Sequence, residues 1–186
     1  MTSMTGAKLG SLVGALGGLV FILANANAGA VSGPWPPVLR GLGVLAFLAV
    51  VALVLRARIL GQGVEPSRGQ LRAYGFTVLV EVAAIVLGSR ILVAAFDLPT
   101  ATLPWVATVL GLHFLVFARI FREAVFVWLG AAVTVCGAAG VVMAVAGAAA
   151  AAISVVAGVV PGLILLLAVG QSAWAGRPVS AQIQGR

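Results

Sequence analysis

The sequence predicts an all-α integral membrane bundle of about six transmembrane helices. Of its 186 residues, 62% are hydrophobic and 8% are charged, and the mean hydropathy is +1.21. Soluble domains carry about 25% charged residues, because their surface must be hydrated. A helix needs about 20 residues to cross a ~30 Å hydrocarbon core, so the chain has room for about six crossings with short connections. The composition excludes a cytosolic enzyme, a secreted disulfide scaffold and a disordered tail.

Six apolar segments are the expected spans of a single transmembrane domain without a soluble domain. They cover residues 9–28, 38–55, 73–96, 102–121, 124–146 and 149–173. The prolines of Ser32–Pro37 end the first connection, because proline lacks an N–H donor and interrupts a helix interior. The polar stretch Gly61–Arg72 separates the second and third spans. Between the fifth and sixth spans, only the length of the apolar run demands a turn near residues 146–150.

The first span has a second interpretation as a cleaved signal peptide. Lys8, an apolar stretch and the small residues of Ala24–Ala28 match the pattern of such a peptide. The stretch from Leu9 to Ala24 is long for a signal peptide and is interrupted by glycines, which favours a retained helix. Cleavage would leave five spans and would not change the orientation of the others.

The basic residues predict an orientation with both termini inside the cell. Cytoplasmic loops carry an excess of Lys and Arg, and this orientation places nine of the eleven basic residues inside. They are Lys8, Arg56, Arg58, Arg68, Arg72, Arg119, Arg122, Arg177 and Arg186. Arg40 and Arg90 lie toward the outer ends of their spans, where long side chains reach the interface; an outer cationic vestibule formed by both is the alternative. Arg119 and Glu123 are spaced as an i,i+4 ion pair.

Small residues predict close helix packing. Gly10, Gly14 and Gly18 form a strip on one face of the first span, and Gly158 and Gly162 repeat the spacing in the sixth. Membrane helices associate where small residues let backbones approach. This packing is expected within one chain; a homo-oligomer or a membrane partner subunit is the alternative use of the same faces.

Proline in the sixth span predicts an irregular helix. Pro161 lies near the middle of the span and is followed by Gly162. Proline removes a backbone hydrogen bond and kinks a helix, so Pro161 is a candidate hinge. Broken helices form binding sites in many transporters, but prolines are also ordinary packing elements of membrane helices.

Glu81 and His113 are the candidate binding or proton-relay residues. Glu81 lies roughly 12 Å from the cytoplasmic start of the third span, and His113 lies roughly 16 Å from the external start of the fourth, at about 1.5 Å per residue. Both depths are near the midplane, where ionisable groups are costly and usually functional. The short connection between the two spans makes them neighbours, so the side chains are expected to meet. A Glu–His couple would suit a proton-linked transporter or permease-like subunit; the alternative is a structural hydrogen bond.

No catalytic, metal or cofactor site is expected. The chain has one His and one Cys, and its four acids are scattered, whereas a metal site needs several such ligands together. No catalytic or phosphate-binding motif is present, so an enzyme is not expected. The arginines lie at the ends of apolar runs, so the +7 net charge does not indicate nucleic acid. The expected partner is the lipid bilayer.

The segment Gly111–Phe121 reads G-L-H-F-L-V-F-A-R-I-F. It resembles a G-x-H-F-L-P-x-A-x-x-F pattern of small multi-pass bacterial membrane proteins of unknown function, with Val116 in place of the proline. The resemblance covers eleven residues and implies that His113 belongs to a recurring feature, without implying an activity. The Ala-, Gly-, Val- and Arg-rich composition also favours a bacterial source, and the expected location is the inner (plasma) membrane. A non-transporting scaffold or accessory subunit, assembled through Gly- and Ala-rich helix faces, is the alternative function.

Overall fold

The structure, a computed structural model, describes residues 6–26, 35–57 and 67–174. Within these ranges the chain forms helices and no strand. The elements are α1 (Gly6–Asn25), α2 (Trp35–Arg56), α3 (Arg68–Ala94), the 3₁₀ turn η2 (Pro99–Ala101), α4 (Thr102–Phe121), α5 (Ala124–Val145), α6 (Ala150–Ser154), the π-helical turn η3 (Val155–Val159) and α7 (Val160–Trp174). Because α6, η3 and α7 form one continuous rod, the described residues contain six helices long and apolar enough to cross a membrane.

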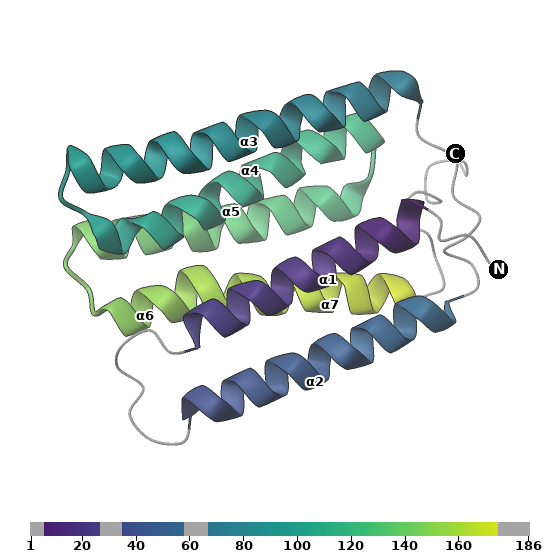
Figure 1. Cartoon of the computed structure of the whole chain (residues 1–186), viewed down its shortest axis with the longest axis horizontal. Coiled ribbons are helices and arrows are strands. Elements are labelled where there is room, and N and C mark those ends of the chain that lie inside the picture. The colour runs from purple at the N-terminus through teal and green to yellow at the C-terminus, as the bar shows by residue number, and fades with distance from the viewer. Residues whose placement is uncertain (1–5, 27–34, 58–66, 175–186) are drawn as a thin grey trace.

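The helices form an elongated bundle with α3 at one edge and α2 at the other (Figure 1). α3 packs mainly on α4, and α4 packs along α5. α5 contacts η3 and α7, which in turn pack on α1, and α2 covers α1 and α7. No residue of α3 is fully buried, so this helix is held almost entirely by the single face that it presents to α4.

Three helices begin earlier than the sequence predicts, and the first of them, α1, starts at Gly6 rather than at residue 9. α2 starts at Trp35 rather than at residue 38, because Pro36 and Pro37 occupy its first turn, where the missing N–H would have no partner in any case. α3 starts at Arg68, inside the stretch expected to be a loop. There the Ser67 side chain accepts a hydrogen bond from the Gln70 backbone N–H, and the Gln70 side chain accepts one from the Ser67 N–H. This capping box satisfies two helix-end donors.

Left-handed residues make the short turns between successive helices. Asp97 (φ 49°) follows α3, Arg122 (φ 56°) ends α4, and Gly147 (φ 71°) follows α5. A backbone in this region reverses the chain quickly after a helix. The turn between α5 and α6 therefore lies where the length of the apolar run required it, and its glycine adopts the positive φ at no steric cost.

Most basic residues in the described ranges lie at one end of the bundle. The starts of α1, α3 and α5 and the ends of α2, α4 and α7 share this end (Figure 1). It carries Lys8, Arg56, Arg68, Arg72, Arg119 and Arg122. Arg40 and Arg90 lie toward the opposite end. The sequence also predicts Arg58, Arg177 and Arg186 on the basic side, but these lie outside the described residues.

Candidate functional site

Several polar residues of α3 are partly buried, and Glu81 among them contacts α4. Thr77, Glu81 and Ser89 are only partly exposed, whereas the large apolar residues on the other sides of this helix are exposed. Thr77 donates its hydroxyl to the carbonyl oxygen of Ala73 at 2.9 Å. An apolar outer surface suits contact with hydrocarbon, and the exposed arginines of α3, Arg68, Arg72 and Arg90, lie toward its ends.

Glu81 and His113 are in contact across this interface. Glu81 Oε2 lies 2.7 Å from His113 Nδ1, and each side chain is 12% exposed. Glu81 is the central residue of Arg68–Ala94, and His113 lies slightly past the middle of Thr102–Phe121. The structure therefore brings together, halfway along two adjacent helices, the two groups that the sequence places at matching depth.

The imidazole of His113 is surrounded by aromatic rings. Its centroid lies 4.2 Å from that of Phe117 and 4.6 Å from that of Phe114. Phe117 also stacks on Tyr74 of α3, with ring centroids 5.1 Å apart. These rings separate the pair from the basic end of the bundle, because Phe117 and Tyr74 lie on that side of His113 and Glu81.

The pair does not satisfy the hydrogen-bonding capacity of the histidine. Oε2 is close to Nδ1 but lies off the direction of an aligned hydrogen bond, and buried Nε2 has no hydrogen-bond partner among the described residues. A neutral imidazole has one donor and one acceptor nitrogen, and leaving a buried polar atom unpaired costs free energy. The arrangement therefore offers a short contact with a carboxylate and a second nitrogen able to bind a proton or another polar group.

A tryptophan links the same two helices nearer the other end of the bundle. The Trp105 Nε1–H of α4 donates to the carbonyl oxygen of Ala84 at 2.9 Å. Gly88 makes room for the indole, because a Cβ at this position would overlap Trp105 Nε1. Sequence reasoning gave Trp105 no packing role. The missed indication was Gly88 on the inward face of α3, one turn beyond Ala84.

The glycines predicted for helix packing take part in a crossing between α1 and the last rod. A Cβ on Gly18 would lie 2.8 Å from Gly162 O, and one on Gly162 would lie 2.7 Å from Gly18 O. Gly14 faces Val169 of α7, and Gly158 is covered by the Asn25 side chain, which donates to the Phe21 carbonyl oxygen at 2.7 Å. No described residue lies within 4 Å of a Cβ built on Gly10. Four of the five predicted packing glycines therefore face residues of the same chain.

Sequence reasoning missed the glycines of the crossing between α4 and α5. A Cβ on Gly111 would overlap Thr134, and one on Gly137 would overlap Thr108. A Cβ on Gly130 would lie 2.8 Å from Gly111 O. Gly130 and Gly137 are seven residues apart, a spacing that places both on one helix face and that could have identified this crossing.

The rod around Pro161 changes its helical geometry. Val155–Val159 forms a π-helical turn, and the Val160 N–H donates to Val155 O, five residues back. Pro161 follows directly and is fully buried. Proline cannot continue α-helical hydrogen bonding, and π-turns are common at functional sites. The irregularity lies where the sequence places a candidate hinge.

The arginines and one predicted ion pair are arranged differently from expectation. Arg40 on α2 and Arg90 on α3 are exposed and lie on helices at opposite edges of the bundle (Figure 1), so they do not share a vestibule within one chain. Arg119 is exposed while Glu123 is buried, and the two form no ion pair. The left-handed turn at Arg122 ends the helix before Glu123, which removes the helical spacing that the pairing requires.

Glu123 is a buried carboxyl group in the turn between α4 and α5. It is 5% exposed, and burial raises its pKa from 4.5 to about 7. Desolvation disfavours the charged form of a carboxyl group. The sequence predicts Glu123 as the helical i,i+4 ion-pair partner of Arg119; the structure instead buries Glu123 in a turn.

Comparisons of the chain with protein-family models, curated proteins and solved structures find no match. The six apolar helices are compatible with a multi-pass membrane protein. In the described residues, no three His, Cys, Asp or Glu side chains gather as a metal-binding group. The arrangement that remains for a functional interpretation is the Glu81–His113 contact between α3 and α4.

Proposed function

We propose that the chain is a small proton-linked transporter or permease-like subunit that uses Glu81 and His113 to bind and release a proton. The observation that carries the proposal is the 2.7 Å contact between Oε2 and Nδ1 in the middle of two apolar helices. Ionisable residues at this depth are costly and commonly mark proton relays or ion pathways. Histidine is suited to such a relay because it changes charge near neutral pH.

The geometry links protonation of the Glu81–His113 pair to the packing of α3 on α4. When the imidazole is protonated, the carboxylate stabilises the cation; when the carboxyl group is protonated, the charge attraction between α3 and α4 is lost. α3 has no fully buried residue and packs mainly on α4, so a change in this contact acts on the main face that holds the helix. Protonation would thus alter the packing of one peripheral helix.

The proposed orientation follows from charge. The end of the bundle that carries Lys8, Arg56, Arg68, Arg72, Arg119 and Arg122 would face the cytoplasm, with both termini inside. The membrane would be the bacterial inner membrane, as the composition and the resemblance of Gly111–Phe121 suggest.

The test uses the full chain reconstituted in liposomes with an internal pH-sensitive dye. A pH gradient is imposed with the membrane potential clamped, and proton flux is measured for wild type, Glu81→Gln and Asp97→Asn. Asp97 is a suitable control because it is exposed in a turn with φ 49°, a conformation that asparagine also tolerates. We expect Glu81→Gln to lower the flux at least tenfold and Asp97→Asn to leave it unchanged.

A second measurement examines the pair independently of transport. The chain contains one histidine, so ¹⁵N-histidine labelling gives the signals of a single imidazole. Glu81→Gln should move these signals at constant pH, because the carboxylate lies 2.7 Å from Nδ1, whereas Asp97→Asn should not. Unchanged signals in Glu81→Gln would contradict the contact; equal flux in wild type and Glu81→Gln would contradict the function.

The alternative function is a scaffold or accessory subunit assembled through small-residue faces. The use of Gly14, Gly18, Gly158 and Gly162 inside the chain counts against those glycines as the assembly surface. Among the described residues, Gly10 and Gly41 have no neighbour within 4 Å of a Cβ, so the alternative would use these glycines. Crosslinking in the membrane, with loss of an oligomer on Gly41→Leu, would favour this alternative.

A further inference from the structure

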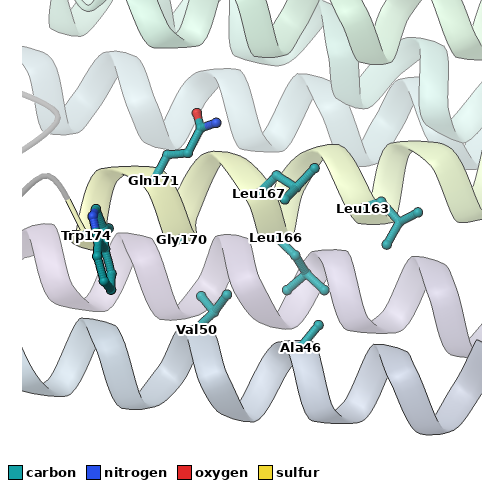
Figure 2. A pocket seen from close by; sticks show the side chains of 8 residues that line it. All are labelled: Ala46, Val50, Leu163, Leu166, Leu167, Gly170, Gln171 and Trp174. Atoms are coloured by element: carbon teal, nitrogen blue, oxygen red, sulfur yellow. The ribbon is translucent and has the colours of Figure 1, made fainter.

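An apolar groove lies between α2 and α7, away from the Glu81–His113 contact. Its volume is about 530 Å³. Figure 2 shows the side chains that line it: Ala46, Val50, Leu163, Leu166, Leu167, Gly170, Gln171 and Trp174. Gln171 is the one polar residue among them, so the groove suits an apolar occupant.

The groove is bounded on its inner side by buried residues and is open on its outer side. Val50 and Leu166 are buried in the core cluster shared by α1, α2 and α7, whereas Leu163, Leu167 and Trp174 are 42%, 63% and 81% exposed. In a membrane, the open side would face the lipid tails. A Cβ built on Gly170 would lie 3.4 Å from a Val50 methyl group, in ordinary van der Waals contact, so α2 and α7 are close at this level of the groove.

The length and position of the groove fit one acyl chain. Leu163 and Trp174 are eleven residues apart on α7, which is about 16 Å along a helix. Half of a ~30 Å hydrocarbon core is about 15 Å. Gln171 and Trp174 lie at the terminal end of α7, and tryptophan prefers the membrane–water interface. The groove therefore runs from one interface to the region of the midplane.

The helix that forms one wall of the groove, α2, ends in a basic residue. Arg56 is in the last turn of α2. Ala57 packs against the core cluster that contains Ala173, so α2 and α7 end at the same level, as Figure 1 also shows. Basic groups between helix ends attract the phosphate of anionic lipids.

We propose that this groove binds an anionic glycerophospholipid, with one acyl chain along α7 and the phosphate beside Arg56. The occupant is a lipid of the leaflet at the basic end of the bundle. Trp174 and Gln171 lie at the level of the glycerol and headgroup, and Leu163 lies at the level of the chain end. This site is independent of the proton-linked function proposed above.

The test measures lipid binding to the full chain in detergent by native mass spectrometry. Phosphatidylglycerol and phosphatidylcholine with identical acyl chains are titrated in parallel. One favourable basic contact corresponds to about a fivefold preference for the anionic lipid. Arg56→Gln should remove this preference, and Arg72→Gln, which changes an exposed arginine at the same end of the bundle on α3, should retain it.

A second pair of variants examines the groove itself. Leu167→Trp fills it with a bulky side chain at a position that is 63% exposed, so the core is not disturbed. Leu79→Trp places the same substitution on the outer face of α3, where the leucine is 67% exposed. We expect Leu167→Trp to reduce binding of phosphatidylglycerol at least fivefold and Leu79→Trp to leave it unchanged.

Three results would overturn the proposal. They are equal binding of the two lipids by wild type, equal effects of Arg56→Gln and Arg72→Gln, and equal effects of Leu167→Trp and Leu79→Trp. A dimer that dissociates only in Leu167→Trp, without bound lipid in wild type, would assign the groove to a second copy of the chain instead.

Discussion

The predicted glycine strip of α1 allows a test of the helix packing, because Gly18 is in close contact with α7 and Gly10 is not. Gly18 faces Gly162, and a Cβ at position 18 would lie 2.8 Å from the Gly162 carbonyl oxygen and 3.0 Å from Leu166 Cγ. Gly10, two turns earlier on the same face, has no neighbour within 4 Å of a Cβ in the part of the chain that the structure describes. The sequence alone gives both glycines the same role.

The expected magnitudes follow from these distances. Ordinary contact begins near 3.4 Å, so Gly18→Ala must separate α1 from α7 by about 0.6 Å or distort the crossing. Overpacking of this kind typically costs about 1–3 kcal/mol. Gly10→Ala meets no neighbour and gains the helix propensity of alanine, which is up to about 1 kcal/mol in a helix interior.

The assay is thermal unfolding of both variants in the same detergent. For a chain of this size, about 1 kcal/mol shifts Tm by about 2–4 °C. Both substitutions gain the same helix propensity, so we expect the Tm of Gly18→Ala to lie about 2–12 °C below that of Gly10→Ala. Gly10→Ala itself should leave Tm unchanged or raise it slightly. Equal shifts of Tm, or a change of oligomeric state in both variants, would refute the intramolecular crossing and restore the strip as an interface between chains.

Three further substitutions test other parts of the structure. Gly88→Ala should displace Trp105, because the new Cβ would overlap its indole nitrogen. In a background that retains Trp105 as its one tryptophan, this substitution should change the tryptophan fluorescence. Gly75→Ala in the same background should leave the fluorescence unchanged, because no described residue lies within 4 Å of a Cβ built on Gly75. Ser67→Ala removes half of the capping box and should cost about 1 kcal/mol, seen as roughly fivefold faster hydrogen exchange in the first turn of α3; unchanged exchange would contradict the cap. Burial raises the pKa of Glu123 to about 7, so the native state holds this proton more tightly than the unfolded chain, and the stability of wild type should fall as pH rises from about 4.5 to about 7. Glu123→Gln should lose this pH dependence, which would make the variant more stable than wild type above pH 7 and similar to it at pH 4. A variant with the wild-type pH profile would contradict the burial of Glu123.

The burial of Glu123 shows how a local spacing rule fails. Arg119 and Glu123 have the separation of an ion pair on a helix, but the left-handed backbone of Arg122 ends α4 between them. The spacing rule holds only while the helix continues. The residue that ends a helix depends on the turn that follows, and that turn is set by the packing of α5 against α4.

The sequence by itself determined the class of fold and the depth of its polar groups. Hydropathy and length are properties of the chain, so the number of long apolar helices could be counted in advance. The depth of Glu81 and His113 follows from a rise of about 1.5 Å per residue, and a short connection makes consecutive helices neighbours. Their 2.7 Å contact was therefore open to prediction.

Only the tertiary structure decided which faces meet between helices distant in sequence. Gly18 and Gly162 are more than a hundred residues apart, and nothing local distinguishes Gly18 from Gly10. Arg40 and Arg90 share a depth but lie on helices at opposite edges of the bundle (Figure 1). Lipid tails and neighbouring helices are equally apolar, so hydropathy does not specify helix partners; shape complementarity at small residues does, and it exists only once the helices are packed.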